Sequence, residues 1–250
     1  MIKFQVLVLA MVYFNNLWAA SCKYNLYQIN SSERAAEKYL SNKSCNKGIN
    51  YYWKKFGFPK KYWDEGFGFH DACNWKKPLS RMFNALFVLQ YAYYPRAKNW
   101  DDLSGPSVKW AYPYVARGLN RLDDTLAGCY KSSSKKNVIA TTQRHWYQDE
   151  WIKFWLPFFY TRNMVERAAT IFHEVRHWRG NLSHNCGKSK DKHYPSKQPY
   201  ALQVDYLITY YWHANRYTSK VHKAFAKELG KSYLGSKFCK SVAKWAENVF

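Results

Sequence analysis

Apolar residues recur every three or four positions over most of the chain, which is the spacing of one face of an α-helix. Leu119, Leu122 and Leu126 form one such series. The pattern predicts helices at 31–42, 82–94, 115–127, 163–178, 200–214 and 220–229, with 242–249 closing the chain. Residues 138–146 are rich in Val, Ile and Thr and are the best strand candidate. The sequence therefore predicts a mainly α-helical protein with a small β-sheet (α+β).

Residues 46–78 depart from this periodicity, because glycines and prolines are mixed there with many aromatic residues. This composition indicates an irregular layer. The chain has no internal repeat and no clean linker, so we expect residues 22–250 to form a single domain.

The first 21 residues have the composition of a secretory signal peptide. Lys3 precedes the apolar run 4–14, and small residues at 19 and 21 would permit cleavage before Cys22. The run is too short to span the roughly 30 Å of a bilayer core, which argues against a transmembrane anchor. Lipidation of Cys22 is the minor alternative. We therefore expect a soluble exported protein, periplasmic or extracellular, with no transmembrane segment after signal removal.

Composition and charge add further constraints. Hydrophobic residues make up 47% of the chain, far too much for a disordered protein, and 39 basic residues against 17 acidic ones give a formal charge of +22. Removing residues 1–21 takes away one lysine and no acidic residue, leaving +21. Export makes all six cysteines candidates for disulfides, and the sequence does not choose their pairing. Those cysteines are 22, 45, 73, 129, 186 and 239.

The motif that carries chemistry is His-Glu-Val-Arg-His at 173–177. On a helix, His173 and His177 lie one turn apart on one face, so both imidazoles can bind one metal ion, for which zinc is the first expectation. Glu174 comes off the helix beside them, where it can deprotonate a metal-activated water for peptide hydrolysis. Gly180 is placed to end this helix in a left-handed turn.

The third metal ligand is open between several residues. His184 is the first choice, because a chain turning at Gly180 could bring it back toward the metal. Asp205, on the next predicted helix, is the alternative third ligand, and Asp191 and His193 are weaker candidates.

Residues 163–210 resemble a group of exported bacterial proteins classed as zinc metallopeptidases of the zincin kind. The resemblance rests on His-Glu-Val-Arg-His at 173–177, His-Asn-Cys at 184–186 and Tyr-Ala-Leu-Gln-Val-Asp-Tyr-Leu at 200–207. It covers about a fifth of the chain, and Val175 replaces the alanine usual in that family. It implies a zincin-like helical core, a 200–214 helix packed beside the metal helix, and a structural disulfide at Cys186.

Four further features are expected around this site. Glu166, seven residues before His173 on the same helical face, could accept a hydrogen bond from an imidazole N–H. Arg176 points away from the ligands and is expected to pair with Asp205 or Glu166. Tyr200 could donate to an oxyanion, and residues 138–143 are the candidate for a substrate-binding edge strand.

The interpretation as an exported zinc metallopeptidase acting on a peptide or protein has one main alternative. This is a basic, aromatic-rich protein without catalysis that binds peptidoglycan or another anionic polymer of the cell envelope. Specific nucleic-acid binding is not expected, since no recognition motif accompanies the charge. Oligomeric state and cleavage preference are not encoded in any of these patterns.

Overall fold

The computed structural model describes residues 31–60, 63, 67–98, 104–119, 122–124, 139–143, 151–187, 189–239 and 242–250. The expected signal peptide, Cys22 and Cys129 lie outside these ranges. The described helices are α2 (Ser31–Lys47), α3 (Trp53–Lys55), α4 (Pro78–Tyr91), α5 (Ser107–Gly118), α6 (Leu156–Tyr160), α7 (Met164–Gly180), α8 (Pro199–His213), α9 (Lys220–Ser236) and α10 (Lys244–Glu247). Short π and 3-10 turns lie at η2 (Gly48–Tyr52) and η3 (Phe69–Asp71), and the strands are β1 (Leu122–Asp124), β2 (Ala140–Gln143) and β3 (Trp151–Phe154). The predicted mainly helical class with a small sheet is confirmed.

The three short strands form one sheet in the order β1-β3-β2. The central strand β3 pairs in parallel with β1 and antiparallel with β2, so that Ile152 lies opposite both Leu122 and Thr142. Among the strands that the structure describes, β2 is therefore at an edge. It also packs against α7, which brings this edge to the helix that carries His173 and His177.

The predicted helix at 115–127 is wrong. The helix in this region, α5, spans Ser107–Gly118, and Leu119 then takes an extended backbone with φ −118° and ψ 113°. Residues Leu122–Asp124 pair with β3 as strand β1. The leucine spacing fits a helix locally, but the pairing with β3 is a tertiary interaction that overrides it.

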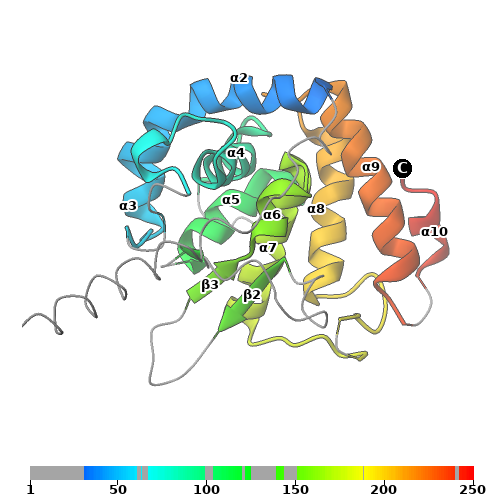
Figure 1. Cartoon of the computed structure of the whole chain (residues 1–250). Helices are drawn as coiled ribbons and strands as arrows, with labels where there is room; N and C mark the ends of the chain where they lie inside the picture. The colour runs from blue at the N-terminus through cyan, green and yellow to red at the C-terminus, as the bar shows by residue number, and fades with distance from the viewer. Residues whose placement is uncertain are drawn as a thin grey trace, which may run out of the picture.

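Helix α7 lies in the middle of the fold, packed against α4, α5, α8, α9 and β2 (Figure 1). Its first twelve residues, Met164–Val175, are all buried, which requires partners for their polar side chains. Arg167 and Glu37 of α2 form a fully buried ion pair, and Asn84 of α4 donates to Glu37 Oε2 at 2.6 Å. Glu33 Oε1 accepts the backbone N–H of Met164 at 3.0 Å. These contacts fix the first turns of α7 against α2.

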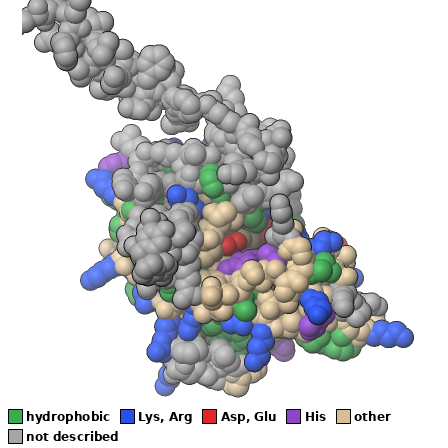
Figure 2. All heavy atoms as spheres, turned by 90° about the horizontal axis from the view of Figure 1, so that it is seen from below, with side chains coloured by type: hydrophobic (Ala, Val, Ile, Leu, Met, Phe, Trp, Pro, Cys, Tyr) green, Lys and Arg blue, Asp and Glu red, His purple; other side chains and the backbone are tan. Residues whose placement is uncertain are grey.

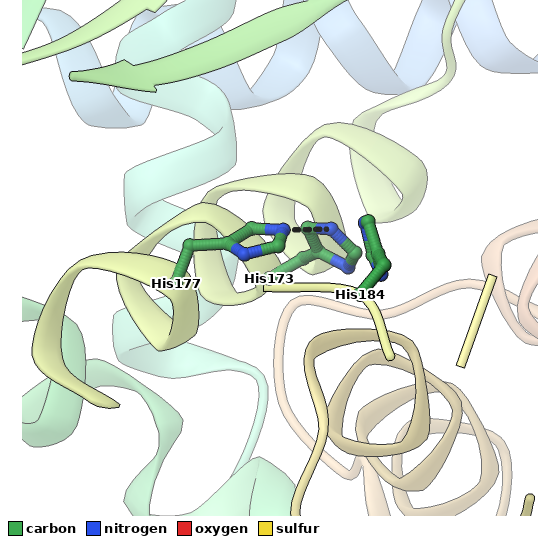
Figure 3. A group of neighbouring side chains, drawn as sticks. All are labelled: His173, His177 and His184. Atoms are coloured by element: carbon green, nitrogen blue, oxygen red, sulfur yellow. Dashed lines mark hydrogen bonds between the residues drawn. The ribbon is translucent and has the colours of Figure 1, made fainter. Parts of the chain in front are cut away.

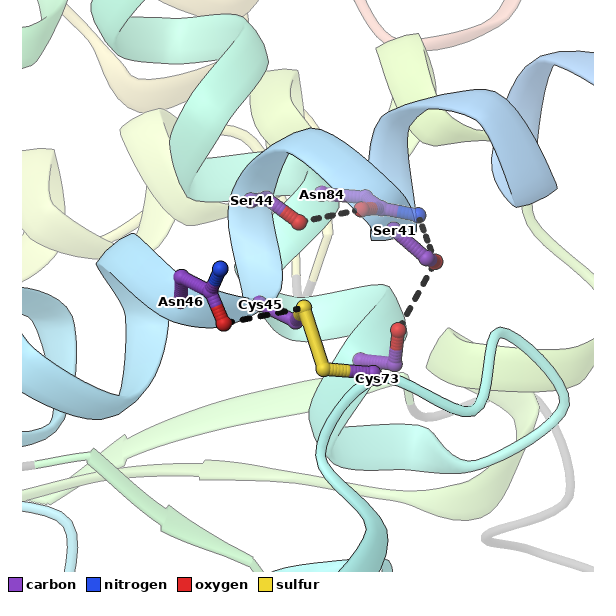
Figure 4. The surroundings of a disulfide bond; sticks show 7 residues. Ser41, Ser44, Cys45, Asn46, Cys73 and Asn84 are labelled. Atoms are coloured by element: carbon purple, nitrogen blue, oxygen red, sulfur yellow. Dashed lines mark hydrogen bonds between the residues drawn. A yellow bond between two sulfur atoms is a disulfide. The ribbon is translucent and has the colours of Figure 1, made fainter.

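Two disulfides lie within the described residues, which is compatible with an exported protein. Cys45–Cys73 ties α2 to the segment before α4 (Figure 4). Asn84 lies beside it, accepting from Ser44 Oγ at 2.7 Å and donating to Ser41 Oγ at 3.0 Å. The second disulfide, Cys186–Cys239, joins the loop after α7 to the end of α9. No helix in these described ranges combines the length and the apolarity needed to cross a membrane.

Candidate metal centre

Helix α7 carries His173, Glu174 and His177, and it spans Met164–Gly180 where a helix at 163–178 was predicted. Asn163 caps the N-terminus by accepting the Glu166 N–H at 2.8 Å. At the other end Gly180 remains helical, and Asn181 takes the left-handed conformation, with φ 47°, that was expected of Gly180. Asparagine tolerates this conformation because its short polar side chain costs little there. The chain then turns back toward the two histidines.

Three imidazoles converge at this turn: His173, His177 and His184, whose candidate ligand atoms all lie within 4.8 Å of one another (Figure 3). Nε2 of His173 and Nε2 of His177 are 3.1 Å apart. Two nitrogens bound to one zinc ion at about 2.0–2.1 Å with a tetrahedral angle would be about 3.3 Å apart. The spacing of these two nitrogens therefore suits a shared metal ion.

The hydrogen bonds of two rings leave the nitrogens that face the cluster free. Nδ1 of His177 lies 2.5 Å from the Leu182 carbonyl oxygen, and Nδ1 of His184 lies 2.8 Å from Oδ1 of Asp191. Both partners are acceptors, so each Nδ1 carries a proton, and in the neutral form of each ring Nε2 then has the lone pair. This is the tautomer that metal-binding histidines need.

The electrostatics favour neutral rings. Burial lowers the pKa of His173 well below its ordinary value of 6.5, and the neighbouring histidines and Lys237 add to this effect. Burial likewise lowers the pKa of His177, with the Leu182 carbonyl acting in the opposite direction. A neutral imidazole is required for metal binding. The residues present therefore fit a metal ion of the kind that imidazoles bind, without selecting its identity.

Asp191 is the residue that holds His184 in place. Its side chain is fully buried and accepts from His184 Nδ1 and, through Oδ2, from the backbone N–H of Ala201 at 3.1 Å. Its backbone pairs with the end of α9, since Asp191 N donates to Lys237 O at 2.9 Å and Cys239 N donates to Asp191 O at 3.0 Å. From the sequence, Asp191 was expected only as a weaker candidate for the third metal ligand. Its contact with His184 gives it a positioning role.

Glu174 is 8% exposed and lies next to the imidazole cluster. Burial raises its pKa to about 7, with the hydrogen bond from Thr142 and the nearby His184 acting in the opposite direction. Thr142 of β2 donates to Glu174 Oε2 at 2.7 Å. Thr142 was missed from the sequence, because no local pattern shows that this strand lies across α7.

These side chains line one pocket of about 800 Å³. Figure 2 shows histidine and acidic atoms together in a hollow of the surface. The lining residues include His173, Glu174, His177, His184 and Tyr200, with Ala140, Thr141 and Thr142 of the edge strand on the other side. The structure thus places the strand expected at 138–143, as far as it is described, against the pocket.

Tyr200, at the start of α8, packs on the imidazoles. Its ring stacks on that of His184, with centroids 4.7 Å apart and 20° between the planes, and lies 4.5 Å from the ring of His173. Burial, followed by the carboxylates of Glu174 and Asp191, raises its pKa to about 12. Its hydroxyl group therefore stays protonated near neutral pH and can serve as a donor.

Two of the candidate third ligands, Asp205 and His193, lie elsewhere. Asp205 accepts from the Tyr194 hydroxyl at 2.5 Å and takes no part in the imidazole cluster. On α8, Tyr200 and Gln203 line the pocket. Asp205 is two positions beyond Gln203, so its side chain is rotated by about 200° around the helix axis from that of Gln203. The alternative third ligand thus lies on a different face of α8. His193 is exposed and also lies outside the cluster.

Glu166 and Arg176 do not make the contacts predicted for them. Glu166 pairs with Arg162 at 3.0 Å and accepts from the Tyr233 hydroxyl at 3.3 Å. It shares a helical face with His173, but seven residues along a helix span about 10.5 Å, too far for a direct hydrogen bond. Arg176 donates to the Lys197 carbonyl at 2.8 Å and to the Tyr114 hydroxyl at 3.3 Å. Its partners are thus neutral oxygens, and neither Asp205 nor Glu166 is among them.

Comparison of the chain with protein-family models, with curated proteins and with solved structures gives no match.

Proposed function

We propose that the protein is a metal-dependent hydrolase, with zinc as the metal and peptide bonds as the substrate. The observation that carries the proposal is the convergence of three imidazoles beside a buried carboxylate in one open pocket. His173, His177 and His184 would hold the ion. When bound by three imidazoles, a zinc ion acidifies a water molecule and polarises a carbonyl group.

Glu174 would accept the proton of the attacking water. A general base works best when its pKa is close to the operating pH, and burial brings the pKa of Glu174 to about 7. As the water oxygen bonds to the carbonyl carbon, the proton moves to Glu174. It then passes from Glu174 to the leaving nitrogen as the C–N bond breaks. The Thr142 hydroxyl holds the carboxylate in position by donating to Oε2.

Two further parts of the pocket suit a peptide substrate. The Tyr200 hydroxyl can donate to the oxygen that becomes negative on the substrate, because its high pKa keeps it protonated. The edge of β2 can accept an extended peptide through backbone hydrogen bonds. The resemblance of residues 163–210 to exported zinc metallopeptidases supports the same class of reaction.

The experiment compares metal content and hydrolysis in the same preparations. We expect one zinc ion per chain by mass spectrometry of the metal and cleavage of a fluorogenic peptide library that a chelator abolishes. Glu174→Gln should keep the zinc and lose cleavage, whereas His184→Ala should lose the zinc. Asp205→Asn serves as a control outside the cluster and should retain both. Folded protein that binds no metal, or Glu174→Gln that cleaves at the wild-type rate, would refute the proposal.

A further inference from the structure

A second pocket, of about 660 Å³, lies among η2, α3, α4 and α5 and shares no lining residue with the metal centre. Helices α3, α4 and α5 lie together in Figure 1. This volume is within the range of small-molecule sites, roughly 300–1,000 Å³. Nothing in the proposed peptidase reaction uses this pocket.

The rim of the second pocket is basic. Lys55, Arg96, Lys98 and Arg117 line it, and all four are exposed. None of the lining residues that the structure describes is acidic. The Arg96 guanidinium lies 5.4 Å from the ring centroid of Tyr91. This cation–π contact positions the guanidinium and leaves its positive charge in place, because the ring is neutral. Positive charges gathered around a concave surface attract an anionic ligand.

The floor of the pocket offers hydrogen-bonding groups. Gln90 is 4% exposed, and its Oε1 accepts from the Tyr52 hydroxyl at 2.6 Å. Gln90 also lines the pocket, and its amide NH2 group is a hydrogen-bond donor by its chemistry. Tyr51 and Tyr112 also line the pocket, and burial raises the pKa of Tyr112, so that its hydroxyl stays protonated. The Tyr112 hydroxyl is buried and has no hydrogen-bond partner among the described residues. A buried polar group without a partner is costly unless a ligand or water satisfies it.

Two tyrosine rings flank this floor. Tyr51 is 39% exposed and Tyr94 is 64% exposed, and both line the pocket. Each carries a cation near its ring: Lys47 lies 5.8 Å from the centroid of Tyr51, and Arg216 lies 5.5 Å from that of Tyr94. Flat aromatic faces suit the C–H faces of sugar rings, while the adjacent cations suit the acidic substituents of such rings.

We propose that this second pocket binds an acidic saccharide, a sugar unit bearing a carboxylate or sulfate group. The acidic group would lie among Lys55, Arg96 and Lys98, the ring hydroxyls would contact Gln90 and Tyr112, and one sugar face would stack on Tyr51. Disulfides are compatible with an exported protein, and acidic sugar polymers are abundant outside cells. The pocket would then anchor the protein on such a polymer, independently of any reaction at the metal centre.

The test is calorimetric titration of the full exported chain at physiological ionic strength. The acidic probes are trigalacturonate and a heparin-derived oligosaccharide. Maltotriose is the neutral control, and polyphosphate and oligothymidylate are anions without the acidic sugar. We expect binding of at least one acidic saccharide that exceeds binding of polyphosphate and oligothymidylate, and no binding of maltotriose.

Matched variants separate the pocket from net charge. Lys55→Glu with Lys98→Glu should weaken saccharide binding by about tenfold or more, since each removes a charged contact. Lys220→Glu with Lys231→Glu makes the same change of net charge at exposed positions of α9, and should weaken binding by less than about threefold, because exposed, distant charges are screened. Tyr51→Ala should weaken binding of the saccharide and leave that of polyphosphate unchanged. Circular dichroism and zinc content verify that each variant is folded.

Three results would overturn the proposal: binding of neither acidic saccharide, equal losses in the two double variants, or tighter binding of polyphosphate or oligothymidylate than of both saccharides. Failure of the peptidase proposal has a different signature. His173→Ala would then change neither hydrolysis nor saccharide binding, whereas failure of the saccharide site leaves zinc binding and peptide cleavage intact.

Discussion

If His184 binds the metal as proposed, the carboxylate of Asp191 should control how tightly it does so, and Asp191→Asn tests this with almost no change of shape. The native side chain accepts two hydrogen bonds, from His184 Nδ1 at 2.8 Å and from the Ala201 N–H at 3.1 Å. An asparagine has one acceptor and one donor group in the same positions. Whichever way the amide turns, its NH2 group faces one of these two N–H donors, so one hydrogen bond is lost.

The expected loss follows from the kind of hydrogen bond that is removed. A hydrogen bond to a charged group contributes about 1.5–3 kcal/mol, and about 1.4 kcal/mol corresponds to a tenfold change in an equilibrium constant. Removal of the outer partner of a metal-binding histidine typically lowers metal affinity by about 10–100-fold. The two estimates agree, so we expect Asp191→Asn to weaken zinc binding by about 10–100-fold.

The assay is competition for zinc against a chelating dye, at pH 7.5 and fixed ionic strength. Asp205→Asn is the matched control, because it makes the same substitution on a carboxylate that contacts Tyr194 and lies outside the cluster. Its zinc affinity should stay within about twofold of the wild type. The unfolding midpoint of the metal-free protein, measured in parallel, separates a loss of metal affinity from a loss of fold.

Either of two results would refute this prediction. If His184→Ala loses zinc binding but Asp191→Asn keeps it within about twofold, then the imidazole of His184 binds the metal without needing its carboxylate partner. If Asp191→Asn and Asp205→Asn weaken binding equally, the effect is one of general charge.

Three further predictions concern the scaffold. Cys239→Ser opens the disulfide next to the third ligand and should weaken zinc affinity in the dye assay, whereas opening the Cys45–Cys73 disulfide should leave that affinity unchanged. Arg167→Met leaves Glu37 buried without its cation, and should lower the free energy of unfolding, measured in urea, by about 3–5 kcal/mol. The double variant with Glu37→Met should recover much of this loss. A double variant that recovers none of it would contradict the pairing. Burial opposes ionisation of Glu33, but His222, the Met164 N–H and the nearby charge of Arg167 together lower its pKa below the ordinary 4.5. The contribution of Glu33 to stability is therefore full above about pH 4.5 and is lost as the pH falls below that value. The acid limb of the stability curve should therefore be shallower in Glu33→Gln than in the wild type, and equal slopes would argue against this linkage.

The parts of the site that the sequence could predict are those set by one helix. His173, Glu174 and His177 lie in consecutive turns of α7, so their relative positions follow from helical geometry alone. The helix start at Asn163 follows from local capping chemistry in the same way. Glu166 shows the limit of this reasoning. It lies on the same face of the helix as His173, but seven residues of helical rise separate the two side chains by about 10.5 Å along the axis.

The contacts that could not be predicted all join distant segments. Thr142 reaches Glu174 from strand β2, and Asp191 reaches His184 only because its own backbone is held by the end of α9. The wrong helix at 115–127 has the same origin, since the pairing of β1 with β3 is a contact between segments about 30 residues apart. The periodicity of apolar residues indicates which side of a segment is apolar, whereas tertiary packing determines which other segment that side contacts.

The choice of His184 over Asp205 has a chemical consequence for the centre. Three neutral imidazoles would leave the charge of a divalent ion uncompensated by its ligands, whereas a carboxylate ligand would offset part of it. An uncompensated ion lowers the pKa of a bound water more strongly, as in known sites with three histidines. Glu174 is the only carboxylate that lines the pocket among the described residues. The carboxylate that faces the pocket is thus the group that would accept a proton in the proposed hydrolysis, while the Asp191 carboxylate contacts His184 from outside the pocket lining.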